Sequence, residues 1–131
     1  MTRLLDTDVC IEYLRGTDAA IRDRLRSLAP ADVCLCSVVK AELLFGAHHS
    51  QHVATNLRRL RDFFAPMTSL VFDDDAADRY GQLRAHLRRE GREIGAHDMM
   101  IAAIALVQDA TVVTRNEAEF ARVPGLSLER W

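Results

Sequence analysis

Short apolar runs alternate along the chain with longer stretches in which apolar residues recur at helical spacing. Four of the short runs end in, or are bounded by, polar residues: RLLD (3–6), VCLC (33–36), SLVFDDD (69–75) and TVVT (111–114). Apolar runs of this length are typical of buried strands. A further strand is predicted in LSLERW (126–131), after a turn in NEAEFARVPG (116–125).

The stretches with helical spacing lie between these strands. They predict helices over residues 8–16, 18–28, 38–50, 51–64, about 75–91, and 96–110. Gly16 and Pro30 are suitable stops for the first two helices. Ser37 is the predicted N-cap of the third helix, and Asp74 and Asp75 are the predicted caps of the fifth. The last helix is apolar on nearly every side, so we expect it to be buried on several faces.

Strands that alternate with helices predict an α/β fold with a mainly parallel β-sheet flanked by helices. The length of 131 residues suits one domain, and no repeat, linker or low-complexity segment divides the chain. We therefore expect residues 1–131 to form a single domain.

Composition narrows the functional classes only a little. No apolar run reaches the roughly 18 residues that a membrane span needs, and Asp6 interrupts the region where a signal peptide would be apolar. We expect a cytoplasmic protein without a membrane partner, in which the three cysteines are small buried apolar residues. The net charge of −2 argues against a strongly basic nucleic-acid clamp, although Lys40 is the only lysine and arginine, which matches phosphate well, supplies the other positive charges.

Three acidic residues occupy positions where the pattern expects apolar ones. Asp6 ends the first strand, Glu42 shares a helix face with Val38, Ala41 and Phe45, and Asp98 begins the most apolar helix. Each has an ordinary explanation: a helix cap for Asp6, a salt bridge to an arginine for Glu42, and a favourable interaction with the helix dipole for Asp98.

The three acids together indicate a metal site. Ligands of open α/β sheets lie beyond the carboxyl ends of the strands, so we expect the three carboxylates to converge there. Converging carboxylates repel one another unless a cation lies between them. Oxygen donors without a Cys/His set suit Mg²⁺ or Mn²⁺, and such a site suits the hydrolysis of phosphate esters.

The blocks LLDTDVCIEYLRG, SVVKAELLFGA, IGAHDMMIAAIAL and TVVTRNEAEFARVPGL follow one another along nearly the whole chain. In that order they resemble the four motif blocks of PIN-domain ribonucleases, and specifically those of VapC-type toxins of toxin–antitoxin pairs. The resemblance implies a PIN-like fold and identifies Asp6, Glu42 and Asp98 with the first three acids of the family.

The fourth acidic position differs from the usual family pattern. Asn116 stands where the fourth acid is usual, and a branch with a similar TxNxxEF segment uses the later glutamate, which corresponds to Glu119. The resemblance thus gives a catalytic set of Asp6, Glu42, Asp98 and Glu119, with Asn116, Thr7 and Thr114 as supporting residues. Asp8, where many relatives have Asn, is expected to brace the first loop.

The resemblance implies a Mg²⁺- or Mn²⁺-dependent endoribonuclease toxin that a VapB-like antitoxin keeps inactive. It also implies a homodimer, with the first helices and the Leu57–Phe64 helix as candidate surfaces. The ending EFARVPGLSLERW is similar to that of toxins that cut initiator tRNA, which makes tRNA the expected RNA substrate.

Other interpretations remain at this point. The main alternative is a PIN-like module that binds RNA or a partner through a weakened metal site, and Asn116 is the residue that favours it. The segment HHSQH (48–52) offers a histidine metal site, although an exposed helix end explains it better. The SVVK segment (37–40) fits a serine acyl-transfer pattern, but the other motifs of that class are absent.

Overall fold

A computed structural model describes all residues from Met1 to Trp131. It contains one five-stranded sheet in the order β3-β2-β1-β4-β5, and all four strand pairs are parallel. The strands are β1 (Arg3–Leu5), β2 (Val33–Cys36), β3 (Thr68–Leu70), β4 (Thr111–Val113) and β5 (Leu128–Glu129). The predicted α/β class and parallel sheet are confirmed.

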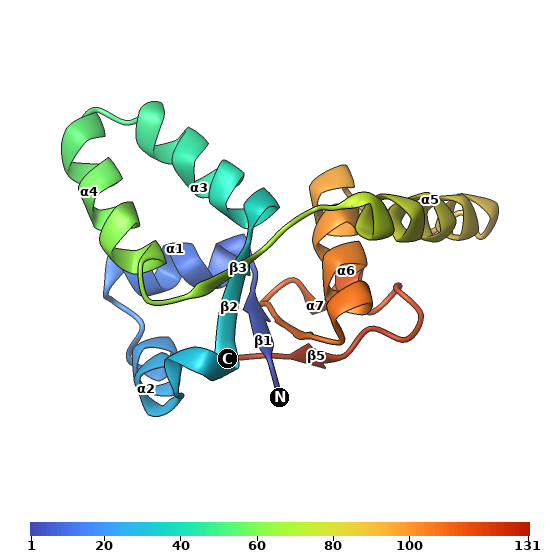
Figure 1. The fold of residues 1–131 in the computed structure, drawn as a ribbon, viewed down its shortest axis with the longest axis horizontal. Helices are drawn as coiled ribbons and strands as arrows, with labels where there is room; N and C mark the ends of the chain where they lie inside the picture. The colour runs from blue at the N-terminus through green and yellow to red at the C-terminus, as the bar shows by residue number, and fades with distance from the viewer.

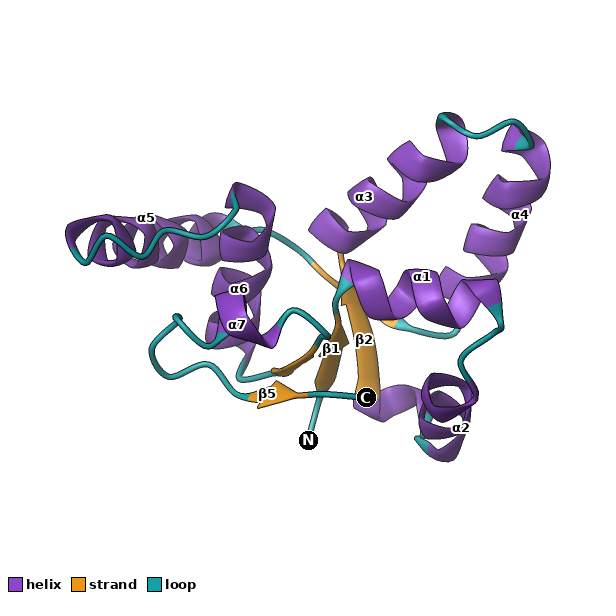
Figure 2. Ribbon diagram, turned by 180° about the vertical axis from the view of Figure 1, so that it is seen from behind, coloured by secondary structure: helices purple, strands orange, loops and turns teal.

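Helices cover the sheet on both sides. Figure 1 shows α1–α4 on one side of the strands and α5–α7 on the other, and Figure 2 shows the same division from behind. The helices are α1 (Thr7–Arg15), α2 (Ala19–Ser27), the 3-10 turn η1 (Pro30–Asp32), α3 (Ser37–His48), α4 (Val53–Phe64), α5 (Asp74–Arg89), α6 (Ala96–Gln108) and α7 (Glu117–Phe120). Helix α6 is the most deeply buried, with five consecutive buried residues from Ile101 to Ala105. None of the helices is both long and apolar enough to span a bilayer.

Several predicted helix boundaries are confirmed, and others are wrong. Gly16 ends α1 in the left-handed region at φ 74°, which glycine adopts without strain. Ser37 does not cap α3. It is the first residue of that helix, and its hydroxyl accepts a hydrogen bond from the Phe72 backbone N–H at 3.4 Å. The cap of α5 is Asp73, whose carboxylate accepts from the Ala76 N–H. In both cases the preceding residue takes the extended backbone conformation that a cap requires.

The C-terminal segment is also more helical than predicted. Residues 117–120 form the short helix α7 instead of a turn, and the last strand covers only Leu128 and Glu129. The three cysteines, Cys10, Cys34 and Cys36, are free and buried, as predicted. One connected cluster of buried apolar side chains includes residues from α1 to α6 and from the three central strands, β2, β1 and β4, so the sheet and its helices share a single core.

Candidate active site

The carboxyl ends of β1 and β4 bring the first site residues together. Both strands are parallel and adjacent, so the residues that follow them, Asp6 and Thr114, lie at the same edge of the sheet. The Thr114 hydroxyl donates a 2.8 Å hydrogen bond to one oxygen of Asp6, and the Thr7 backbone N–H donates to the other at 2.8 Å. Both carboxylate oxygens of Asp6 therefore have a fixed direction.

Asp6 carries out two functions that the sequence analysis treated as alternatives. It is the N-cap of α1, and it is also a nearly buried acid with 5% of its surface exposed. Burial raises the pKa of Asp6 to about 6, and the nearby charges of Asp8 and Glu42 add to the rise, whereas the hydrogen bond from Thr114 opposes it. No arginine, lysine or histidine forms a salt bridge with this carboxylate.

Glu42 reaches the same edge from α3, but the helix face that it shares with Ala41 and Phe45 is not the buried apolar face that the pattern predicted. The core side of α3 is formed by Val39, Leu43 and Ala47. Ala41 and Phe45 are exposed instead, with 69% of Phe45 accessible. Because α3 is apolar on several sides, its hydrophobic pattern does not distinguish the core face from the face beside the site.

The contacts of Glu42 do not include an arginine. Its carboxylate accepts a hydrogen bond from the Thr7 hydroxyl at 3.1 Å, and the only basic side chain within 4.0 Å is the exposed His97, whose Nδ1 lies at that distance. The salt bridge that would have explained this acid as structural is therefore absent. His97 was not identified from the sequence, where only its place next to Asp98 distinguishes it.

Asp98 lies in the first turn of α6, which the helix dipole favours. The pKa of Asp98 is raised to about 7, and burial is the largest cause of the rise. The further causes are a hydrogen bond with the Glu119 carboxyl and the charges of Asp6, Glu119 and Glu42. The Asn116 amide makes a long contact of 3.5 Å to Asp98. A carboxyl whose pKa is raised by three neighbouring acids belongs to an acidic cluster that lacks a counter-charge.

The structure therefore gathers residues from four separated segments. They come from the start of α1, from α3, from the first turn of α6 and from the segment 114–119. In this arrangement, however, no three His, Cys, Asp or Glu side chains are positioned to hold a metal ion together. The two oxygens of Asp6 accept hydrogen bonds from Thr7 and Thr114 instead.

Asp8 has the bracing function expected for it. One of its oxygens accepts from the Val9 N–H at 2.7 Å, and the other accepts from the Arg115 N–H at 3.1 Å. It therefore joins the start of α1 to the loop after β4. The histidines of the α3–α4 connection, His48, His49 and His52, are all exposed.

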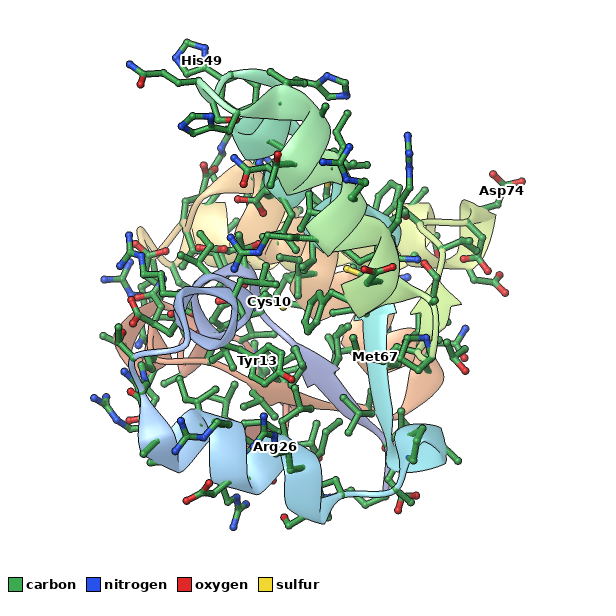
Figure 3. The ribbon with its side chains drawn as sticks, turned by 90° about the vertical axis from the view of Figure 1, so that its left-hand side faces the viewer. Cys10, Tyr13, Arg26, His49, Met67 and Asp74 are labelled. Atoms are coloured by element: carbon green, nitrogen blue, oxygen red, sulfur yellow. The ribbon has the colours of Figure 1, made fainter.

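Two hollows lie along α1 and α4 on the side of Glu42. The smaller, of about 240 Å³, includes Glu42 together with Ile11, Leu43 and Leu60. The larger, of about 450 Å³, lies between α1, α2 and α4, and Figure 3 labels Tyr13, Arg26 and Met67 from its lining. Both are lined by Leu14 and Arg59, so the two adjoin. The larger one contains none of the site acids.

Comparisons with known proteins agree with this geometry. The family model of the PIN domain matches residues 3–126. A tRNA(fMet)-specific endonuclease VapC of Shigella flexneri is 39% identical over 128 residues, which cover 98% of this chain and 96% of that protein. A crystal structure of DNA-bound VapBC from Salmonella typhimurium contains a chain with a TM-score of 0.94 and 36% identity, covering 100% of this chain and 98% of that one.

A third relative extends the comparison to another bacterium. The Ribonuclease VapC2 of Rickettsia felis is 33% identical over 132 residues, covering 100% of this chain and 98% of that protein. The fold, the acidic cluster at the strand ends and these full-length similarities lead to one conclusion. The chain belongs to the PIN-domain family, among the VapC ribonucleases.

Proposed function

We propose that the chain is a Mg²⁺- or Mn²⁺-dependent endoribonuclease toxin that hydrolyses phosphodiester bonds in tRNA, with initiator tRNA as the preferred substrate. The observation that carries the proposal is that Asp6, Glu42, Asp98 and Glu119 gather at one edge of the sheet without an arginine or lysine partner. Burial first, and neighbouring acids after it, raise the pKa values of Asp6 and Asp98. The choice of initiator tRNA rests on the name of the Shigella flexneri relative. We further propose that residues 1–131 are one PIN domain, which the single sheet and core support.

The donor chemistry of the site fits a hard divalent cation. Asp6, Glu42 and Asp98 offer carboxylate oxygens, which Mg²⁺ and Mn²⁺ prefer. Asp6 is nearly buried and has no cationic partner, a situation that is costly unless a cation binds. Glu42 and Asp98 are only partly buried, so their side chains have room to rotate toward a shared ion.

Each residue of the site has a proposed task. A bound divalent cation supplies a Lewis acid that polarises the scissile phosphate and lowers the pKa of a water. Thr114 and Thr7 keep the oxygens of Asp6 and Glu42 directed into the site through their hydrogen bonds. The Glu119 carboxyl lies beside Asp98, and the Asn116 amide supports Asp98 from the loop.

Cleavage of purified tRNA tests the proposal. The protein is incubated with bulk tRNA and with initiator and elongator tRNA transcripts, in Mg²⁺, in Mn²⁺ and in EDTA. We expect cleavage at one internal position of initiator tRNA that requires the divalent cation. Tight RNA binding with no cleavage in either metal would instead support the alternative, a PIN-like binding module.

The metal-free acidic cluster predicts an unusual pH dependence of stability. The folded-state pKa values of Asp6 and Asp98, about 6 and about 7, exceed the unfolded value of 3.8, so the folded protein holds more protons between pH 4 and pH 7. Their contribution to folding stability therefore falls as the pH rises through this window. In EDTA, Asp98→Asn should gain about 2 kcal/mol relative to wild type between pH 4.5 and pH 8, after allowance for partial exposure.

Thermal unfolding at several pH values measures this gain. The matched control is Asp75→Asn, because Asp75 also lies in the first turn of a helix, α5, but is exposed. The helix dipole stabilises an acid in the first turn, so Asp75→Asn should not gain stability. A gain of the same size in this control would contradict the proposed cluster. Added Mg²⁺ should stabilise wild type more than Asp98→Asn.

We propose a homodimer as the functional unit, with the first helices and the Leu57–Phe64 helix as candidate surfaces. Leu60 and Phe63 are largely buried within the chain, but Tyr13, Leu14 and Phe63 line the larger apolar hollow between α1, α2 and α4. Outside this hollow, Phe45 and Val71 are exposed apolar side chains, at 69% and 57%. Light scattering at micromolar concentration should give twice the mass of one chain, and Phe45→Ser should reduce it; a wild-type monomer would contradict the proposal.

A further inference from the structure

The loop that follows β4 connects the acidic cluster to the rest of the molecule. Thr114 is completely buried, donates to Asp6 at 2.8 Å, and accepts a hydrogen bond from the Asn116 N–H at 2.9 Å. The Asn116 side chain in turn contacts Asp98. The position of this loop therefore determines how Thr114 contacts Asp6 and how Asn116 contacts Asp98.

Arg115, between these two residues, is held by groups far away in the sequence. Its Nε donates to the Trp131 carbonyl oxygen at 3.1 Å, and its Nη2 donates to Asp18, in the connection between α1 and α2. Its backbone N–H donates to Asp8 at 3.1 Å. Arg115 thus connects the loop to the start of α1, to the α1–α2 connection and to Trp131, two residues after β5.

The residues around Trp131 are themselves anchored. The Trp131 indole N–H donates to Glu129 at 3.1 Å, and the Arg24 guanidinium carbon lies 5.6 Å from the centre of the indole ring. The Glu129 carbonyl oxygen accepts from the Thr114 N–H at 3.1 Å. The segment 129–131 therefore contacts both Thr114 and Arg115, and Trp131 is only 9% exposed.

We propose that Arg115 is a positioning residue, through which Asp18 and the C-terminal residue Trp131 hold the loop that directs Asp6 and Asp98. The inference rests on the proposed function, because it assigns a task in cation binding and cleavage to residues that do not touch the acids. The Arg115 side chain bonds Trp131 and Asp18 and none of the site acids, so it acts through its chain neighbours Thr114 and Asn116 and through its backbone contact to Asp8.

The planar guanidinium explains why position 115 requires arginine. The guanidinium is a planar fork that donates in two fixed directions, here to a carbonyl oxygen and to a carboxylate. A lysine has one point charge on a flexible stem and would keep only one of these partners in place. Outer contacts of this kind are worth about 10- to 100-fold in metal affinity or activity in metal sites.

Three variants separate the links of the network. Arg115→Ala removes both side-chain hydrogen bonds, and Arg115→Lys keeps the charge but not the fork. Asp18→Asn removes the negative charge that faces Arg115 while keeping an oxygen for its second contact, the cap of the Ile21 N–H at 3.1 Å. The matched control is Arg122→Ala, since Arg122 is also partly buried and donates to a backbone carbonyl, that of Glu93, at 3.2 Å.

Each variant is measured in three ways. Amide hydrogen exchange on the metal-free protein reports the mobility of residues 114–116. Mn²⁺ titration followed by electron paramagnetic resonance reports cation affinity without any RNA. Single-turnover and steady-state cleavage of tRNA separate kcat from KM.

For Arg115→Ala we expect faster exchange at residues 114–116, a Mn²⁺ affinity reduced about fivefold and a kcat reduced about 10- to 30-fold. The KM for tRNA should stay within about twofold, because Arg115 does not contact the substrate. Arg115→Lys should recover only part of the loss. The double variant Asp18→Asn/Arg115→Ala should be no worse than Arg115→Ala alone, since both changes break one link.

Several results would overturn the proposal. If Arg115→Ala and Arg122→Ala change exchange, Mn²⁺ affinity and kcat equally, Arg115 is only a structural residue. If KM rises while kcat is unchanged, Arg115 binds substrate instead of positioning the loop. If wild type cleaves no RNA, the proposed function fails, but hydrogen exchange and Mn²⁺ affinity still test the positioning role. Changes of the expected size in these two measurements would support that role.

Discussion

Replacing Asp98 by Asn is expected to reduce RNA cleavage by at least about a thousandfold, which corresponds to about 4 kcal/mol of lost transition-state stabilisation. The change keeps the size of the side chain but removes the negative charge with which Asp98 would hold a divalent cation. It also removes the carboxyl whose pKa is raised by the neighbouring acids Glu119, Asp6 and Glu42 in addition to burial. The fold should persist, because relief of the repulsion among these acids stabilises the metal-free protein near neutral pH.

The comparison variant is again Asp75→Asn, an exposed acid in the first turn of α5. It should cleave like wild type. Single-turnover rates at saturating Mg²⁺, with circular dichroism to verify the fold, provide the measurement. Cleavage by Asp98→Asn at the wild-type rate under the same metal would show that this acid does not hold a catalytic cation.

A VapB-like antitoxin is expected to lose about 100- to 1000-fold in inhibition when one arginine that enters the acidic site is changed to alanine, since losing one partner of a desolvated charge pair costs about 2–5 kcal/mol. The partner itself is proposed from the VapBC complexes among the similar structures. The acids Asp6, Glu42 and Asp98 have no arginine or lysine partner within the chain. An inserted guanidinium would supply the missing positive charge with bidentate hydrogen bonds and block the scissile phosphate.

The surface beside the site indicates how the partner would reach it. The hollow that includes Glu42 is lined by Ile11, Leu14, Leu43 and Leu60, and it adjoins the larger hollow between α1, α2 and α4. An apolar segment of the partner would fit along this surface and end at Glu42. Leu43 lines this hollow from the core side of α3, and Phe45, on the same helix, is exposed and could contact the partner.

Inhibition constants at increasing Mg²⁺ concentration test the arginine mechanism. Excess Mg²⁺ should compete with the wild-type antitoxin and should have little effect on the arginine-less variant. An exposed arginine elsewhere on the partner, changed to alanine, is the control. Equal inhibition by the arginine-less variant would mean that binding outside the acidic site is responsible for inhibition.

Local pattern in the sequence determined much of what the structure contains. Alternation of short apolar runs with helical segments was enough for the α/β class and the parallel sheet, because burial on both faces demands apolar strands. The unusual position of Asp6 after a strand and the apolar context of Asp98 were visible without coordinates, since a charge is costly beside apolar residues. Glu42 was singled out in the same way, although the face that carries it is not the core face, and the motif blocks identified the family.

Tertiary structure decided the contacts between distant segments. Thr7 meets Glu42 and Thr114 meets Asp6 only because β1, β2 and β4 lie side by side and end at one edge. The face of α3 that carries Glu42 could not be assigned from its pattern, because several of its faces are apolar. The hydrogen bonds from Arg115 to Trp131 and Asp18 could not be predicted from local spacing either. Hydrophobic periodicity records which side of an element is buried, whereas the partner of a polar group depends on how the elements pack, and packing is a property of the whole chain.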